Sequence, residues 1–579
     1  MNLKRKLSAV ALEVKPTSWL DDSFGELHST LFILMRSLAN PSFFTLHSSF
    51  FLLHSSFILL LFVACSKHPS LPSDFTQLDA QPIIWPDYTG VTVPPNIAPL
   101  NFLVDSVDDV VALIGEQTYG GKDNKVQIDE DEWHEMLAAA KGKSLSVNVY
   151  TRKDGKWFGY KPFVINVAED EIDPYISYRV LPPTFVGFDE LAIRQRNLTN
   201  FEETDIYNNR QISKGLEGQC INCHSYQNYR TDNMMFHTRL QHPGTMIVSD
   251  GELLFVNLKD ESMISAAAYN SWHPSLPIIA FSTDHTMQSF HTRDISKVEV
   301  MESASDIIIY DIKKNRVQTV LNDSAEFELF PSWSPDGKWL YYCSAHYEYK
   351  NKYEDTEELL QQYRTLQYNL YRLSFDASTM TFGQPELIYD AVSLDRSAVQ
   401  PRISQDGRYV LFAEGPWGLF HIWHTSADIK MLDLEAIDHS PLTIDHSSKS
   451  ISSFPSEEAG RDSMVNVQCS MFNGQCSMVN VQPINSPLPE SYPSFSSNDR
   501  WVMFESRRDD GNYTRTFISY FDREGRLHKP FEVPAEDPEY FRLLLRSWSR
   551  PEFMKEPVRI TPRQFYEKAL TEPIKVDGK

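Results

Sequence analysis

The chain has few cysteines and no excess of positive charge, and the charge balance excludes one class of partner. Of its 579 residues only six are cysteine, and the formal net charge is −24. Binding to phosphate backbones needs a basic face, so this balance argues against a nucleic-acid partner. The acidic residues are dispersed along the chain, where their ordinary effect is solubility.

Several catalytic motifs are also missing. The sequence has no Gly-x-Ser-x-Gly nucleophile elbow, which excludes a peptidase of the α/β-hydrolase type. It has no phosphate-binding loop, and the pair His134-Glu135 lacks the second histidine that a zinc protease needs. Long amphipathic helices are scarce. With 12% aromatic residues and 34 prolines, the composition instead favours an all-β protein with many turns, long enough for more than one domain.

The N-terminal region predicts a lipoprotein signal peptide. An apolar run from Phe43 to Ala64 is interrupted by histidine and serine, and its purely apolar part, Phe57–Ala64, is too short to cross a bilayer. The sequence Phe62-Val63-Ala64-Cys65 resembles a bacterial lipobox, although Phe62 replaces the usual Leu, Val or Ile. We predict that residues 1–65 are an extension plus signal peptide, that translation starts at Met35, and that acylated Cys65 anchors the protein. The alternative is an apolar segment with a buried cysteine.

The next two regions are expected to be a tether and a small β domain. Residues 66–80 are rich in proline and serine, which is typical of a tether. Residues 81–170 alternate short strands and turns, including a hairpin around Lys153-Asp154-Gly155. One helix is expected to begin at Asp129, with Glu132 in a capping box and Trp133, Leu137 and Ala140 buried. We predict an immunoglobulin-like β-sandwich for this region.

A five-residue motif, Cys220-Ile221-Asn222-Cys223-His224, carries the strongest chemical signal. This spacing attaches a c-type haem: the two thiols add to the haem vinyl groups, and the histidine next in sequence binds the iron. The alternatives are half of a zinc site, a redox Cys-x-x-Cys, or coincidence. A zinc site needs a second Cys/His pair and a redox motif needs a βαβ setting, and neither is present.

The sixth iron ligand is expected in Asn233-Met234-Met235-Phe236-His237, within the haem segment of residues 171–260. If this stretch is extended, Met235 and His237 share one face and Met234 and Phe236 the other. We favour Met235 over His237, and a methionine ligand raises the reduction potential relative to two histidines. The alternative is that the methionines pack in the core.

A repeat beyond residue 240 predicts a β-propeller. The segments Pro331–Tyr342, Pro401–Phe412 and Pro493–Phe504 share a strand, an Asp-Gly-type turn and a second apolar strand, and Ser271–Phe281 is a weaker copy. Repeats of about 40–60 residues of this kind indicate propeller blades, about six here, over residues 261–545. We expect a helix near Glu354–Tyr368 and a disordered insertion near 436–486. Residues 546–579 are predicted to be a C-terminal tail with a helix near Pro562–Leu570.

The Pro-x-Trp-Ser-Pro-Asp-Gly-Lys repeat resembles the TolB-type β-propeller. Together with the lipobox and Cys220–His224, the chain is similar to a family of exported bacterial propeller lipoproteins with one haem-c motif, often labelled cytochrome c biosynthesis proteins. The resemblance covers about residues 80–545. It implies a periplasmic protein anchored to the outer membrane and facing the periplasm, but it brings no established reaction.

Three functions remain open at this point. The first is electron transfer by a covalent haem c with a redox partner in the cell envelope. The second is a binding or scaffold propeller whose haem is structural or absent, because fold alone does not choose function. The third is a haem-dependent oxidoreductase or peroxidase with an open iron site near His237, Arg239 and His242. We favour them in this order.

Overall fold

The computed structural model of the chain describes residues 68–182, 190–211, 219–260, 263–291, 298–347, 356–435 and 477–577. The predicted lipobox at Cys65 and residues 436–476 of the predicted insertion lie outside these ranges. Contacts between residues divide the chain into Met1–His68 and Pro69–Lys579, and the second unit is described here by itself. No helix among the described residues is long and apolar enough to cross a membrane.

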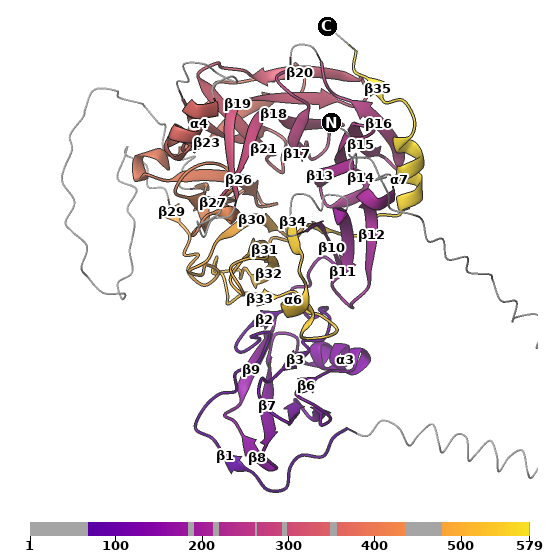
Figure 1. Cartoon of the computed structure of the whole chain (residues 1–579), viewed down its shortest axis with the longest axis vertical. Helices are drawn as coiled ribbons and strands as arrows, with labels where there is room; N and C mark the ends of the chain where they lie inside the picture. Colours follow the sequence, from indigo (N-terminus) through magenta and orange to yellow (C-terminus); the bar gives the residue numbers. More distant parts are fainter. Residues whose placement is uncertain are drawn as a thin grey trace, which may run out of the picture. The chain divides into compact units, whose positions relative to one another are not determined.

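The first part of this unit is built on a seven-stranded sheet (Figure 1). Its strands are β1 (Thr76–Gln77), β2 (Thr92–Val93), β4 (Asp109–Ile114), β5 (Gln117–Gly120), β7 (Ser144–Lys153), β8 (Lys156–Gly159) and β9 (Phe163–Val167). Strands β3 (Phe102–Leu103) and β6 (Lys125–Val126) form a separate pair. The hairpin predicted around Asp154 is present as β7 and β8. Strand β1 lies in the predicted tether and pairs with β8. These pairings do not show an immunoglobulin-like sandwich for residues 81–170, which stays a prediction.

Helix α3 (Glu130–Ala140) begins after Asp129 and buries the residues that the sequence predicts, while the capping box with Glu132 stays a prediction. The side chain of Asp129 accepts a hydrogen bond of 3.1 Å from the backbone N–H of Glu132, which satisfies one of the free donors of the first turn. The buried residues are Trp133, Leu137 and Ala140, spaced so that they share one face. The same hydrophobic core continues into residues of the later sheets, among them Ile176 and Trp548.

The rest of the unit has a propeller-like arrangement of sheets (Figure 1). The first sheet joins β10 (Tyr175–Leu181), β11 (Ala192–Asn197) and β12 (Glu203–Asn208) to the late strand β34 (Ser547–Met554). The second contains β13 (Gln219–Gln227), β14 (Arg230–Leu240), β15 (Gly244–Ser249), β16 (Glu252–Asn257) and the late strand β35 (Ile574–Lys575). The predicted C-terminal tail therefore contributes strands to two sheets.

A nine-stranded sheet follows, made of two meanders joined by one parallel pair, Ser305 with Phe327. Its strands are β17 (Ala267–Trp272), β18 (Ile278–Phe290), β19 (Val298–Asp311), β20 (Arg316–Leu321), β21 (Glu326–Trp333), β22 (Trp339–His346), β23 (Asn369–Asp376), β24 (Thr381–Phe382) and β25 (Glu386–Tyr389). Two four-stranded sheets complete the arrangement: β26 (Ser397–Ile403), β27 (Tyr409–Gly415), β28 (Asp428–Asp433) and β29 (Ser477–Met478), then β30 (Glu490–Phe495), β31 (Trp501–Ser506), β32 (Arg515–Tyr520) and β33 (Phe531–Glu532).

The short helices lie between or after these strands. They are α4 (Thr356–Gln362), α6 (Tyr540–Leu543), α7 (Pro562–Ala569) and the 3-10 turns η3 (Asn209–Gln211), η5 (Tyr363–Thr365), η6 (Val392–Leu394) and η7 (His421–Trp423). Helices α4 and α7 lie within the two segments that the sequence predicts to be helical. Thr561 and Gln564 form a capping box at the start of α7, and Phe565 is buried on its inner face.

Six inner strands contact one another in a closed ring: β13, β17, β21, β26, β30 and β34. Each inner strand has the same irregularity in its pairing. At one point it advances three residues while its neighbour advances two, so the inner strand carries one extra residue. This is a β-bulge. One bulge residue in each strand has a positive φ between 41° and 61°: Cys223, Tyr269, Phe330, Gln400, Tyr492 and Arg550. The repeat in sequence therefore corresponds to a repeat in backbone conformation at the centre of the ring.

The turns after three of the predicted inner strands, β21, β26 and β30, are fixed by one set of hydrogen bonds. The Ser334 hydroxyl donates to Asp336 at 2.6 Å and accepts from the backbone N–H of Trp339 at 2.9 Å. The turns at Ser404 and Ser496 repeat both bonds. Serine and aspartate side chains can bond nearby backbone groups in place of other backbone groups. They therefore favour the tight turn that comes before the second strand.

The glycines of two equivalent turns give a matched test of the fold. Gly337 and Gly407 have φ of 71° and 75°, but a Cβ at Gly337 would lie 2.4 Å from His273 Nε2, whereas at Gly407 it meets only Pro335 at 3.7 Å. We expect Gly407→Ala to lower the free energy of unfolding by about 1–2 kcal/mol, the cost of a left-handed residue, and Gly337→Ala to cost clearly more. Equilibrium denaturation measures both, and equal losses would contradict the predicted clash with His273.

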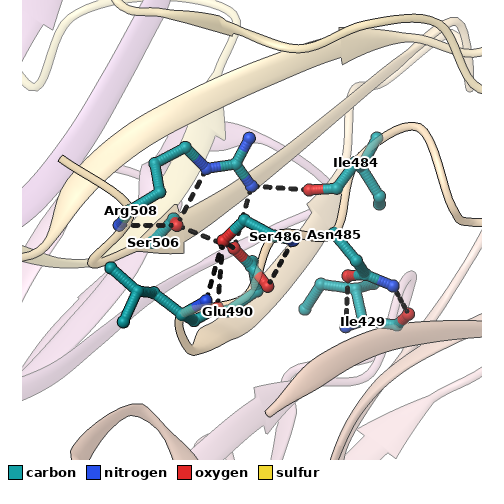
Figure 2. A network of polar contacts seen from close by, with 8 residues as sticks. Ile429, Ile484, Asn485, Ser486, Glu490, Ser506 and Arg508 are labelled. Atoms are coloured by element: carbon teal, nitrogen blue, oxygen red, sulfur yellow. Dashed lines mark hydrogen bonds and ion pairs between the residues drawn. The ribbon is translucent and has the colours of Figure 1, made fainter. Parts of the chain in front are cut away.

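The chain re-enters the propeller at the end of the predicted insertion, and residues 477–486 are part of the fold. Strand β29 pairs with β28, and Ile484 is fully buried. The Asn485 side chain donates to the backbone oxygen of Ile429 and accepts from its N–H, both at 2.9 Å (Figure 2). Buried Glu490 bonds Ser486 and Ser506 and pairs with Arg508 at 2.9 Å. The predicted end of the insertion, near residue 486, therefore lies about ten residues beyond the point where the described fold resumes, at residue 477.

Candidate functional site

The predicted haem motif lies in β13, the inner strand of its sheet. Cys220 is half-buried, Cys223 is 7% exposed and His224 is fully buried. The bulge falls on the motif itself, because Asn222 pairs with His237 and Ser225 pairs with Met235. With a φ of 56° at Cys223, the strand turns at this point. The motif is thus built into the central ring of strands.

The motif is also a copy of the propeller repeat, which sequence reasoning missed. Cys223-His224-Ser225-Tyr226 occupies the bulge positions that Phe330-Pro331-Ser332-Trp333 and Tyr492-Pro493-Ser494-Phe495 occupy in two other inner strands. The serine and the following aromatic residue were the available signal. This signal was not recognised because His224 follows Cys223 where the other copies have proline, and because no Asp-Gly turn follows the strand.

His224 lies with its ring in contact with Tyr226, at 6.2 Å between centroids and an interplanar angle of 71°. Neither ring nitrogen makes a hydrogen bond of ordinary geometry to a described residue. Burial lowers the pKa of His224 to about 3, and the positive charges of Arg550, Arg179 and Arg402 act in the same direction. The backbone carbonyl of Ser177 opposes them weakly. The imidazole is therefore neutral at physiological pH, which is the form that binds a metal.

The two cysteines are free thiols in different surroundings. Cys220 packs against a hydrophobic cluster that includes Ile221. Cys223 lies close enough to Tyr269, Tyr492 and Arg550 to influence the pKa of each of them. Its backbone oxygen accepts a hydrogen bond from the Asn270 side chain. Of the other cysteines, Cys343 is fully buried in a hydrophobic cluster, consistent with the predicted core position.

Met235 and His237 lie on one face of β14, and Met234 and Phe236 on the other, as the extended conformation predicts. Met235 packs with Ile279 and Phe281 toward β17–β19. His224 lies instead toward β10, where Ser177 and Arg179 act on it. The structure therefore brings Met235 and His237 together but places His224 on the opposite face of the sheet. Neither Met235 nor His237, the two predicted sixth ligands, therefore lies beside His224 in this structure.

His237 is held by its own hydrogen bond. Its Nδ1 lies 3.0 Å from the Thr245 hydroxyl, its ring packs on Phe281, and burial lowers its pKa well below the usual range. His242 is exposed in the turn between β14 and β15, with a φ of 49°. Of the two histidines that the peroxidase hypothesis grouped, His237 is therefore buried and His242 is exposed.

A cavity of about 110 Å³ begins immediately after the motif. Its walls include Ser225, Tyr226, Ser271, Trp333, Arg402 and Glu552. Ligand pockets usually have volumes of about 300–1,000 Å³, so Tyr226 and its neighbours must turn aside for a group as large as haem. No cluster of three or more His, Cys, Asp or Glu residues in the described ranges is arranged to hold a bare metal ion. Two free thiols and a neutral imidazole are the donors that a covalent haem uses, but the described cavity is too small to hold one.

Comparisons with known proteins leave the family open. No family model and no curated protein matches the chain. Among solved structures, it is similar to the tricorn protease (10% identity, 68% of this chain, 33% of that chain, TM-score 0.31). It is also similar to the Synechocystis apocarotenoid oxygenase (12%, 79% and 95%, TM-score 0.35) and to Kuenenia stuttgartiensis hydrazine synthase (9%, 77% and 98%, TM-score 0.30). The chain thus spans a third of the tricorn protease, and likenesses this low assign none of these activities to it.

Proposed function

We propose that the chain is a membrane-anchored periplasmic protein that carries one covalent haem c and transfers electrons to or from a partner in the cell envelope. Cys220 and Cys223 are the attachment sites and His224 is the iron ligand. The observation that supports this best is His224, a fully buried imidazole whose ring nitrogens make no hydrogen bond of ordinary geometry to a described residue, next to two free thiols. The haem supplies one-electron chemistry, and the buried strand around His224 excludes water from that ligand.

The remaining parts of this proposal concern architecture and location. We infer a TolB-type propeller of six blades, in which the two meanders of the nine-stranded sheet count as separate blades, preceded by an immunoglobulin-like domain. Acylated Cys65 anchors the protein to the outer membrane, facing the periplasm. Met235 or His237 completes the iron coordination only if β13 and β14 rearrange when haem is attached, because both lie on the other face of this sheet.

The test is an absorption spectrum of residues 66–579, exported in a host that attaches haem c. We expect a reduced-minus-oxidised α-band of a c-type haem that stays with the chain after denaturation. The double variant Cys220→Ser/Cys223→Ser is expected to lose all covalent haem. Cys343→Ser is the matched control, because this thiol is buried in a different hydrophobic cluster, and it should keep full haem content.

One observation favours the second candidate, a binding propeller with a structural haem or none. Cys223-His224-Ser225-Tyr226 fits the propeller repeat without any ligand, and the adjoining cavity is small. A colourless, well-folded wild-type protein would contradict electron transfer and favour this function. A five-coordinate iron in the loaded protein would favour the third candidate, a haem-dependent oxidoreductase or peroxidase with His237 and Arg239 near the iron.

A further inference from the structure

A second pocket lies between the first sheet and the segment that joins α6 to β34. Its volume is about 620 Å³, within the usual range of about 300–1,000 Å³ for ligand pockets. The lining includes three buried apolar side chains of the sheet: Val180, Ala192 and Trp548. Among the described residues, the lining includes none from the motif Cys220–His224. A ligand in this pocket is therefore independent of the proposed haem.

Two leucines of the pocket wall are strongly exposed although their backbone is held in place. Leu543 is 70% exposed and Leu545 is 59% exposed. Buried Arg515 donates hydrogen bonds to three backbone oxygens of the same segment, at 2.7, 2.9 and 2.7 Å: those of Phe541, Leu544 and Arg546. Contact of apolar side chains with water is unfavourable. Because the segment is fixed before any ligand arrives, the leucines offer a preorganised apolar surface.

One end of the pocket has an excess of positive charge. The Glu190 carboxylate accepts a hydrogen bond of 3.0 Å from Arg210 and a second one from Arg546. Two guanidinium groups thus share one carboxylate. The Arg210 side chain is 68% exposed, so most of its donors face the solvent. This end of the pocket is therefore suited to an anion.

The acidic groups at the other end are occupied within the protein. Asp205 accepts hydrogen bonds on both oxygens, from Arg194 and from Asn208, each at 2.8 Å. Glu203 accepts from the same Arg194 at 2.6 Å. These carboxylates already have a cation as their partner. The hydrogen-bonding capacity left for a ligand is therefore mainly that of the donors of Arg210 and Arg546.

We propose that this pocket binds a single-chain amphiphile with a carboxylate head group, the chemistry of a fatty acid. The carboxylate binds Arg210 and Arg546, since a planar guanidinium can hold a carboxylate through two parallel hydrogen bonds. The hydrocarbon chain covers Leu543, Leu545 and the apolar lining from the sheet, and removes them from water. This binding site goes beyond the proposed function and does not rest on it.

The first experiment titrates residues 66–579 with octanoate, decanoate and dodecanoate in a calorimeter, below their micelle concentrations. We expect one molecule to bind per chain, with an affinity that rises about fourfold for each methylene group that becomes buried. Dodecyltrimethylammonium has the same chain and a cationic head group, and it should bind at least about tenfold more weakly than dodecanoate. Absence of saturable dodecanoate binding, or equal affinity for both amphiphiles, would overturn the proposal.

Two variants separate the two halves of the site. Arg210→Gln should weaken dodecanoate binding about tenfold, because it removes a charge-assisted hydrogen bond. Leu543→Gln/Leu545→Gln should weaken it at least about tenfold, because the chain loses its apolar surface. All three side chains are exposed, so the thermal unfolding of both variants should match that of the wild type. Wild-type affinity in both variants would contradict the assignment of the pocket.

The matched controls change the same residue types outside this pocket. Arg408→Gln removes an arginine that pairs with Asp433 at the surface, and Leu240→Gln replaces a leucine that is 65% exposed in β14. Neither residue lines the pocket, and both controls should bind dodecanoate as the wild type does. Equal losses in controls and pocket variants would show general adsorption of the amphiphile and overturn the proposal. Haem content decides nothing here, so this inference and the proposed function fail separately.

Discussion

Replacing Trp548 by alanine is expected to lower the free energy of unfolding by about 3–5 kcal/mol, the usual cost of deleting a buried aromatic side chain. Trp548 is 1% exposed and lies in β34. Its ring stacks on Tyr178 at 3.7 Å and meets the edge of Phe541 at 4.9 Å. The cavity left by alanine would lie where the first sheet receives its last strand. Chemical denaturation followed by tryptophan fluorescence and circular dichroism measures the loss.

Two variants make this prediction specific. Trp548→Phe keeps an aromatic ring on Tyr178 and should lose clearly less stability than Trp548→Ala. Trp157 in β8 is only half-buried, so Trp157→Ala should cost less than about 1 kcal/mol. A small loss for Trp548→Ala, similar to that at Trp157, would show that β34 does not hold the first sheet together.

Replacing Arg508 by methionine is expected to destabilise the protein by about 3–5 kcal/mol at pH 8, because it leaves a buried carboxylate without its cation. Glu490 is fully buried and pairs with Arg508 at 2.9 Å (Figure 2). Methionine keeps much of the packing on Phe517, which the guanidinium covers at 4.5 Å. The loss of stability should therefore come mainly from the missing positive charge of Arg508 and less from a change in side-chain volume.

The pH dependence of this loss follows from the pKa of Glu490. Burial raises it from 4.5 to about 7, although Arg508 opposes the shift. A carboxyl with a raised pKa in the folded state loses stability as the pH rises from its unfolded to its folded value. Without Arg508 the pKa rises further, so the variant should be closer to wild type at pH 5 than at pH 8.

The double variant Arg508→Met/Glu490→Gln is the control for this prediction. It removes both charges and leaves an amide that can still bond Ser486 and Ser506, so it should recover much of the stability at pH 8. Unfolding curves of the three proteins at pH 5 and pH 8 decide the question. An Arg508→Met loss that is the same at both pH values would mean that the ion pair is not what it removes.

The propeller-like architecture could be predicted because its signals are local. Ser334 and Asp336 fix the turn by bonds within six residues. The same pair recurs at Ser404, and at Ser496 with Asn498 in place of the aspartate. Two inner strands escaped prediction for the opposite reason. In β13 and β34 the bulge residues are Cys223 and Arg550, and no Asp-Gly turn follows them. Their place in the ring depends on contacts with distant strands, which periodicity does not reveal.

The candidate site could be predicted only in part. The alternation of Met235 and Phe236 between two faces follows from an extended strand. The side on which His224 lies does not, because the bulge at Cys223 inserts one extra residue and changes which face the following side chains occupy. Arg179 and Arg550, whose charges lower the pKa of His224, were not predicted as its neighbours. They lie 45 and 326 residues from His224 in sequence, in β10 and β34, which pair with each other in the first sheet.

Strand β34 has a consequence for the order in which the molecule can assemble. It completes the first sheet and the ring of inner strands, yet it comes from residues 547–554, near the end of the chain. During synthesis, the strands β10 to β33 emerge before it. The wall of the ring next to Cys223 therefore stays open until the last residues arrive. Arg550 also belongs to β34, so Cys223 has fewer neighbours before this strand docks than it has in the folded chain.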